Sequence, residues 1–171
     1  EHCPNLRLLI AGDGEERAML EGLARELGVE RQVCFAGWIS DTDSFYNAID
    51  INTLTSLSET FPYALTEGAR AGLPTVASRV GGVPYLTEDG VPGLLFEAGD
   101  PDGLARQLTA LAQDATLRAH LGRRLYQKAK EDFSLESTLQ RQLHIYETIL
   151  RRHSRKGGQR DGVLVCGAYG R

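Results

Sequence analysis

The sequence predicts an α/β protein with a Rossmann-like parallel sheet that is covered by helices on both faces. Short apolar runs alternate along the chain with segments whose apolar residues recur at helical spacing. The connections are a few residues long, and such alternation is typical of parallel strands joined by helical crossovers. The runs that we expect to be strands are residues 6–11, 33–35, 49–54, 75–77 and 94–96.

Composition limits the classes of function. The chain has 171 residues, 42% hydrophobic and 25% charged, which is ordinary for one globular domain. Its formal net charge of −4 argues against a nucleic-acid-binding protein, which normally carries a basic surplus. The three cysteines are widely spaced and form no C-x-x-C pair, so neither a disulfide framework nor a zinc site is indicated. We therefore expect cytoplasmic, metal-free chemistry without a nucleic-acid partner.

The first predicted strand is followed by the turn Gly12-Asp13-Gly14 and then by a helix that Gly28 ends. Asp13, with Glu16 three residues later, predicts a capping box at the start of this helix. Gly12 and Gly14 could bring the backbone close to a ligand, and a tight turn without a ligand is the alternative interpretation. The helical spacing rests on Leu20, Leu23, Ala24 and Leu27.

The second strand leads into a loop that opens with Gly37 and Trp38. Ser40 or Asp41 is expected to cap a short helix after it. Ligands of open α/β sheets bind beyond the carboxyl ends of the strands, so this loop should face the ligand crevice. Trp38 could stack on a ligand there, or it could be a half-buried packing residue.

Residues 57–82 are the unit around which the chain is organised. Pro62 fits the first turn of a helix, and Gly72 and Pro74 should end that helix. The first amides of a helix have no partner inside it and lie at the positive end of the helix dipole. Because the strand at residues 49–54 precedes this helix start, the loop between them is a candidate phosphate-binding site.

Glu59 and Glu67 flank this helix start and are eight residues apart. On a continuous helix that spacing is about 12 Å, which is longer than the roughly 5–9.5 Å between paired glycosidase carboxylates. Two acids so far apart fit the two ends of one extended ligand, each accepting hydrogen bonds from hydroxyl groups. A nucleotide sugar has hydroxyls at both ends and phosphate between them. Solvated surface glutamates are the alternative interpretation.

The rest of the first 151 residues is predicted to be mainly helical. Asp100 and Pro101 mark one helix start, and residues 115–130 and 134–151 read as two further amphipathic helices. The apolar stripe of the last helix consists of Leu139, Leu143, Tyr146 and Leu150.

Three further basic or titratable side chains are Arg79, His120 and His144. Arg79 could reach a diphosphate, and a solvated loop arginine is the alternative. His120 and His144 lie on predicted helices without ligand-spaced neighbours, so we expect them to be surface or packing residues.

The character of the chain changes after residue 151. Residues 152–160 are basic, contain glycine and lack periodicity, which indicates a linker, with a membrane-surface patch as the alternative interpretation. Residues 161–171 read as one strand and are predicted to be the truncated start of a further domain; they are similar to the opening of polysaccharide pyruvyl transferases.

A series of motifs in a fixed order carries a family resemblance. They are residues 9–14, 33–38, 59–67 with the pattern E-x7-E, 71–78, 80–84, 90–96 and Asp100. In this order they resemble the C-terminal, donor-binding domain of family-four (group 1) retaining glycosyltransferases, over residues 5–150. That family has the GT-B fold, so the resemblance implies one of its two Rossmann-like halves. The first βα unit and the whole N-terminal domain are expected to be missing.

The resemblance also implies roles for individual residues. Glu67 would bind the ribose hydroxyls, and Glu59, the catalytic candidate, would contact the donor sugar without acting as a nucleophile. The implied donor-binding residues are completed by Thr60, Phe61, Pro62, Tyr63 and Ala64 at the helix start, together with Gly12, Gly14, Gly37 and Trp38.

The chain departs from the family pattern at a few positions. Thr60 stands where glycine is usual, Tyr85 where glutamate is common, and Thr55-Ser56 where Pro-Ser is usual. A side chain at Thr60 could narrow the approach to the phosphate, so the donor preference is affected more than the fold.

The expected function of the parent protein is transfer of a hexosyl unit, with retention, from a nucleoside diphosphate sugar to a glycan or lipid-linked acceptor. The family implies no metal or other cofactor. The expected location is cytoplasmic, from the cysteine usage, with peripheral attachment at the inner membrane face as an extension of it. The isolated fragment is expected to be inactive. A nucleotide-sugar epimerase or sugar-phosphate synthase of the same architecture, and a non-catalytic nucleotide-binding module, are the alternatives.

Overall fold

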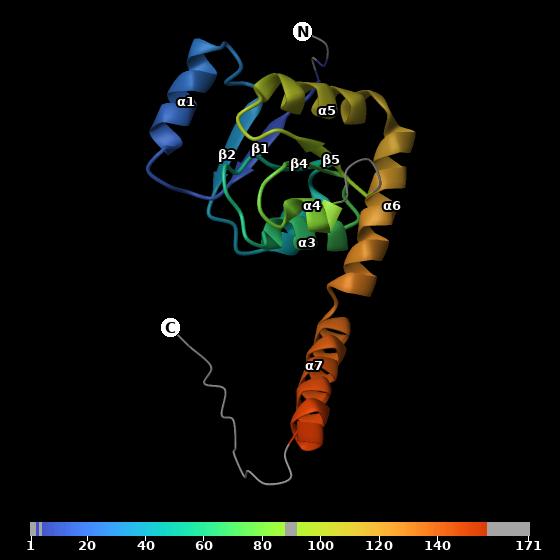
Figure 1. Ribbon diagram of the computed structural model, residues 1–171. Helices are drawn as coiled ribbons and strands as arrows, with labels where there is room; N and C mark the ends of the chain where they lie inside the picture. The colour runs from blue at the N-terminus through green and yellow to red at the C-terminus, as the bar shows by residue number, and fades with distance from the viewer. Residues whose placement is uncertain (1–2, 4, 88–91, 157–171) are drawn as a thin grey trace. The chain divides into compact units, whose positions relative to one another are not determined.

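The computed structural model describes residues 3, 5–87 and 92–156, with the side chains of residues 154–156 excepted. The chain divides into two compact units, residues 1–133 and 134–171, and each is described by itself. The strands of the first unit are β1 (Leu8–Ala11), β2 (Val33–Gly37), β3 (Asn52–Leu54), β4 (Thr75–Ser78) and β5 (Leu94–Phe96). Its helices are α1 (Arg17–Glu26), α2 (Thr42–Asn47), α3 (Tyr63–Arg70), α4 (Val83–Thr87), α5 (Pro101–Gln113) and α6 (Ala115–Asp132) (Figure 1). Each predicted apolar run coincides with one strand or overlaps it, which confirms the α/β class.

The strands are parallel, as predicted, but they form two sheets instead of one. β1 pairs with β2, and β4 lies between β3 and β5. Among the described residues, no strand pairing joins the two sheets. A doubly wound sheet has the strand order 3-2-1-4-5-6, and the strands here correspond to its 3-2 and 4-5-6 parts.

β4 is buried on both faces, so successive side chains pack into different cores. Ala77 packs with Leu65 of α3 in one core, and Val76 packs with Leu111 of α5 in the other. Figure 1 shows α5 on one side of β4 and β5, with α3 and α4 on the other. Helices therefore cover both faces of this sheet, as the sequence predicts.

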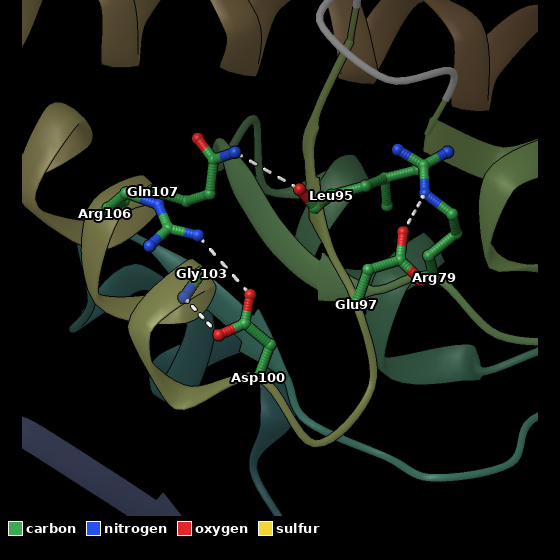
Figure 2. Close-up of polar contacts among 7 residues, drawn as sticks. All are labelled: Arg79, Leu95, Glu97, Asp100, Gly103, Arg106 and Gln107. Atoms are coloured by element: carbon green, nitrogen blue, oxygen red, sulfur yellow. Dashed lines mark hydrogen bonds and ion pairs between the residues drawn. The ribbon is translucent and has the colours of Figure 1, made fainter.

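The start of α5 is tied to the end of β5 by side-chain hydrogen bonds (Figure 2). α5 begins at Pro101, as predicted; the Asp100 carboxylate accepts a hydrogen bond from the Gly103 amide at 2.9 Å, and Arg106 lies 3.4 Å from its second oxygen. Gln107 donates to the Leu95 carbonyl at 3.2 Å. These contacts fix the direction in which α5 leaves the sheet.

Two predicted helix starts need correction. α1 begins at Arg17 after Glu16, which makes no capping hydrogen bond, so the capping box at Asp13 is wrong. The Asp13 carboxylate instead accepts from the Gly14 amide at 3.0 Å, because its short side chain bonds within its own turn. Pro62 precedes α3 as its N-cap, with an extended ψ of 117°, instead of lying in the first turn.

Of the two short helices α2 and α4, the sequence predicts only α2. Asp41 caps α2, as predicted, by accepting from the Ser44 amide at 3.0 Å, and hydrogen bonds from Ser44 lower the pKa of Asp41. α4 was not predicted. Its five residues make little more than one turn, which is too short to show a helical period.

The second unit contains α7 (Leu135–Lys156). This helix extends beyond the predicted end at residue 151, so residues 152–156 are helical instead of belonging to a linker. Residues 157–160 of that linker, and the predicted further domain at 161–171, lie outside the described residues. The predicted apolar stripe of α7 is exposed; its members are Leu139, Leu143, Tyr146 and Leu150.

α3 ends where the sequence predicts, and this turn packs against α6. Gly72 has a φ of +75°, and its amide donates to the Ala69 carbonyl at 2.9 Å. On α6, a Cβ atom at Gly122 would overlap the carbonyl oxygen of Gly72. The absence of a side chain at Gly122 therefore permits the helix to approach the turn.

We predict that Gly122→Ala lowers the free energy of unfolding of the 171-residue chain by about 1–3 kcal/mol, because backbone atoms of the facing turn cannot move aside. Gly22→Ala in α1 is the matched control, since a Cβ there meets only the end of the Arg25 side chain. That variant should gain about 0.5–1 kcal/mol from helix propensity. Urea unfolding of both variants measures the difference, and a stabilised Gly122→Ala protein would contradict the packing.

Candidate functional site

The ends of β1 and β2 bring two of the predicted glycine loops together. The Gly12 amide donates to the Gly37 carbonyl at 2.7 Å, and the two residues have φ values of +115° and +70°. Both conformations are left-handed or nearly so, which favours glycine at each position. Gly14 and Trp38 follow directly in the same two loops. Trp38 is 84% exposed, so the half-buried packing interpretation is wrong.

Arg17 joins these two loops, and sequence reasoning did not single it out. Its Nη2 donates to the Phe35 carbonyl at 3.3 Å, and its guanidinium lies 5.9 Å from the centroid of the Phe35 ring. Glu21 accepts from its Nε at 2.9 Å, and Asp13 lies 3.9 Å away. Two carboxylates therefore balance the charge of Arg17 beside the loops.

Glu59 lies in the loop between β3 and α3 and is half-buried. The Ser56 hydroxyl donates to its Oε1 at 2.6 Å. Ser78, the last residue of β4, donates from its hydroxyl to the Ser56 carbonyl at 2.6 Å. The loop that carries Glu59 is therefore attached to the neighbouring buried strand.

The Gly81-Gly82 loop packs against the same segment through its backbone. A Cβ at Gly81 would overlap the Glu59 carbonyl oxygen, and a Cβ at Gly82 would overlap that of Thr60. Gly81 also has a φ of +50°. Both glycines are required by this close approach, which the sequence shows only as a motif.

The start of α3 has the features of an anion-binding helix start. In the described part of the chain, no residue accepts a hydrogen bond from the amides of Phe61, Tyr63 or Ala64. Thr60 and Tyr63 are exposed, whereas Pro62 is buried. The Phe61 ring lies 5.5 Å from that of Phe133, so it packs to one side of the turn.

Glu67 is held from α2 by a tyrosine. The Tyr46 hydroxyl donates to its Oε2 at 3.0 Å and lies 3.4 Å from the Ala64 carbonyl. Burial, with a smaller effect of the Glu67 carboxylate, raises the pKa of the Tyr46 phenol well above its usual value. Asn52 of β3 also donates to the Ala64 carbonyl, at 3.0 Å. α3 is thus fixed to both α2 and β3 at its first turn.

An open hollow of about 410 Å³ lies beside Glu67. Arg70 and Asp43 form an ion pair at its edge, with 2.6 Å between Nη2 and Oδ1. Glu59 is not among its lining residues, which are Asp43, Tyr46, Asn47, Glu67, Arg70 and Ala71. The hollow offers carboxylate, hydroxyl and guanidinium groups to a polar ligand.

The remaining candidates from the sequence are Arg79, His120 and His144. Arg79 follows β4 and pairs with Glu97, which follows β5, with 3.0 Å between Nε and Oε1 (Figure 2). His120 and His144 are exposed. In residues 3, 5–87 and 92–156, no group of three or more His, Cys, Asp and Glu side chains could hold a metal ion. Within the same residues, no helix has the length and apolar character needed to cross a bilayer.

Comparison with known proteins decides the family. The sequence profile of the glycosyl transferases group 1 matches residues 1–128. The chain belongs to this family. The relatives below show which group 1 glycosyltransferases it is similar to.

Lipopolysaccharide core biosynthesis glycosyltransferase LpsE from Rhizobium meliloti (strain 1021) is 37% identical over 134 residues, which are 78% of this chain and 39% of LpsE. N-acetyl-alpha-D-glucosaminyl L-malate synthase from Bacillus anthracis is 32% identical over 145 residues, covering 85% of this chain and 38% of the synthase. The chain thus spans about two fifths of the length of these curated relatives.

The crystal structure of Anabaena Alr3699/HepE in complex with UDP matches with a TM-score of 0.78 at 26% identity, covering 85% of this chain and 42% of HepE. HepE has also been solved in complex with UDP-glucose. The GT-B fold implied by the sequence motifs is therefore shown for this group 1 glycosyltransferase segment.

We predict that Tyr46→Phe lowers the stability of the chain by about 1 kcal/mol near neutral pH, because Glu67 is half exposed and water partly replaces the lost hydrogen bond. The raised pKa of Tyr46 gives the folded state more bound protons than the unfolded state above about pH 10. The contribution of the Tyr46 hydroxyl to the free energy of unfolding is complete below that pH and is lost as the pH rises further.

The stability difference between Tyr46→Phe and the unmodified chain should therefore shrink above about pH 10, as measured by urea unfolding at a series of pH values. Tyr126→Phe, on the exposed surface of α6, is the control and should keep the alkaline dependence of the unmodified chain. A constant difference across this pH range would contradict the role of the Tyr46–Glu67 contact.

Proposed function

We propose that this chain is the donor-binding part of a retaining glycosyltransferase. The parent protein transfers a hexosyl unit from a nucleoside diphosphate sugar to a glycan or lipid-linked acceptor. The observation that carries the proposal is the arrangement of α3, whose unpaired first amides lie between Glu59 and Glu67. Membership of the group 1 family and the likeness to HepE, solved with UDP and UDP-glucose, support it.

The roles follow from the chemistry of each group. The amides of Phe61, Tyr63 and Ala64 bind the diphosphate, because unpaired helix-start donors and the helix dipole favour an anion there. Glu67 accepts hydrogen bonds from the ribose, and the hollow beside it supplies room for that end of the ligand. Glu59 accepts hydrogen bonds from the donor sugar at the other end. The N–H groups also stabilise negative charge that develops on the leaving diphosphate.

The two glycine loops complete the donor site in this proposal. Gly12 and Gly14 approach the ligand through their backbone, and Gly37 places the exposed Trp38 where it can stack on the base. Thr60 and Pro62 shape the turn before α3. No metal or other cofactor has a role in this scheme, because helix-start amides stabilise the diphosphate.

We also propose a domain assignment for the parent protein. Residues 1–151 form most of its C-terminal domain, and a further strand joins the two sheets at the position between β1 and β3. A separate N-terminal domain binds the acceptor, so this chain alone is inactive in transfer. The reaction takes place on the cytoplasmic side, with peripheral attachment at the inner membrane when the acceptor is lipid-linked.

We predict that the 171-residue chain binds UDP in calorimetry and that Glu67→Ala weakens this binding about 10- to 150-fold. That range corresponds to the loss of hydrogen bonds to a charged group, about 1.5–3 kcal/mol. GDP and ADP titrations identify the base preference.

Glu26→Ala is the control for this experiment. Glu26 ends α1, and a crossover helix runs back from the carboxyl ends of the strands, so its end lies at the opposite edge of the sheet from the proposed site. This variant should bind UDP like the unmodified chain. Equal binding by the Glu67→Ala protein would exclude the ribose role, and no binding of any of the three nucleotides would contradict the donor site.

A further inference from the structure

We propose that Ser56 and Ser78 are positioning residues that hold the Glu59 carboxylate for contact with the donor sugar. The inference rests on the proposed function, which makes the sugar the ligand of Glu59. Neither serine would itself touch the ligand in this role.

The first contact lies between Ser56 and the carboxylate. The Ser56 hydroxyl donates to Oε1 of Glu59 at 2.6 Å, a separation typical of a hydroxyl that donates to a carboxylate. A carboxylate has two oxygens and about four acceptor positions, so Oε2 keeps its capacity for sugar hydroxyls. Ser56 thus restrains the side chain without consuming its acceptors.

The second contact connects Ser56 to the sheet. Ser78 is fully buried at the end of β4, and its hydroxyl donates to the Ser56 carbonyl at 2.6 Å. β4 is paired on both sides and buried along its length, so Ser78 has little freedom to move. The position of the Glu59 carboxylate is therefore set by a strand that is paired on both sides and buried.

The third contact fixes the backbone of Glu59 itself. The Gly81-Gly82 loop, which follows β4, lies directly against the carbonyls of Glu59 and Thr60. The Gly81-Gly82 loop thus restrains the Glu59 backbone, and the hydrogen bonds from Ser78 to Ser56 and from Ser56 to Glu59 restrain its side chain. A free glutamate has several rotatable bonds, and ordering it on binding has an entropic cost of up to about 2 kcal/mol. A carboxylate that is already oriented avoids most of this cost.

The test compares two ligands, UDP and UDP-glucose, in calorimetry with the 171-residue chain. Only UDP-glucose carries the sugar that Glu59 is proposed to contact. Ser56→Ala should weaken UDP-glucose binding about tenfold and leave UDP binding within about twofold. Ser56→Thr keeps the hydroxyl and should restore UDP-glucose binding. Ser78→Ala should act in the same direction with a smaller effect, because it changes the position of Ser56 only.

Thr66→Ala is the matched control for loosening of α3. Its hydroxyl donates to the Tyr63 carbonyl at 2.9 Å and makes no contact with Glu59, so both ligands should bind this variant normally. Thermal unfolding of every variant shows that the fold is kept. If Ser78→Ala fails to fold, the Ser56 pair of variants still decides the question.

The outcomes distinguish failure of the positioning role from failure of the proposed function. The positioning role is overturned if Ser56→Ala lowers the affinity for UDP and for UDP-glucose equally, or lowers neither. It is also overturned if Ser56→Thr does not restore the affinity for UDP-glucose. Donor binding stands in each of these cases. Equal affinity of the unmodified chain for UDP and UDP-glucose also overturns it, because Glu59 then gives no contact with a glucosyl group. Absence of binding to UDP and UDP-glucose overturns the proposed function for a uridine donor, and the positioning role with it.

Discussion

The close approach of the Gly81-Gly82 backbone to the carbonyls of Glu59 and Thr60 is the constraint on which the candidate site depends. These two loops follow β3 and β4, which pair in parallel from Asn52 opposite Thr75. Parallel strands end at the same edge of a sheet, so their loops must share limited space. A side chain at either glycine would force the loops apart and would move the start of α3.

The direction of α3 depends on a second set of contacts, which hold the Ala64 carbonyl in its first turn. Asn52 and Tyr46 both direct hydrogen-bond donors at the Ala64 carbonyl, from β3 and from α2. Gly68 makes room for this arrangement, because a Cβ there would overlap the amide of Asn52. The same tyrosine holds Glu67. One buried amide and one buried phenol thus determine where the second acid lies relative to the helix start.

The structure shows the surroundings of two residues that depart from the family pattern. Tyr85 stands where glutamate is common, and its ring lies 6.0 Å from that of Phe133, with the Lys128 ammonium 5.8 Å from its centroid. Phe133 also contacts Phe61 at the start of α3. The substitution therefore adds an aromatic ring to the Phe133 side of this contact. Thr60 is exposed, so its side chain lies at the surface of the turn and not within its packing.

The sequence by itself determined the α/β class, the strands, the ends of α1 and α3, and the starts of α2 and α5. These features rest on interactions between residues a few positions apart, and such interactions leave local patterns. The same locality explains the errors, because Asp13 had a competing local hydrogen bond and α4 was too short for a period. The GT-B resemblance likewise came from motif order.

Only the tertiary structure decided which groups hold the acids. Ser56 and Glu59 are near neighbours, but Ser78, Tyr46 and Asn52 act on residues far from them in the chain. Serine, tyrosine and asparagine have many possible partners, and no spacing rule specifies which one folding brings within 3 Å of a given atom. The close contact of Gly81-Gly82 with Glu59 is of the same kind. Its physical cause is the pairing of β3 with β4, which exists only once the sheet has formed.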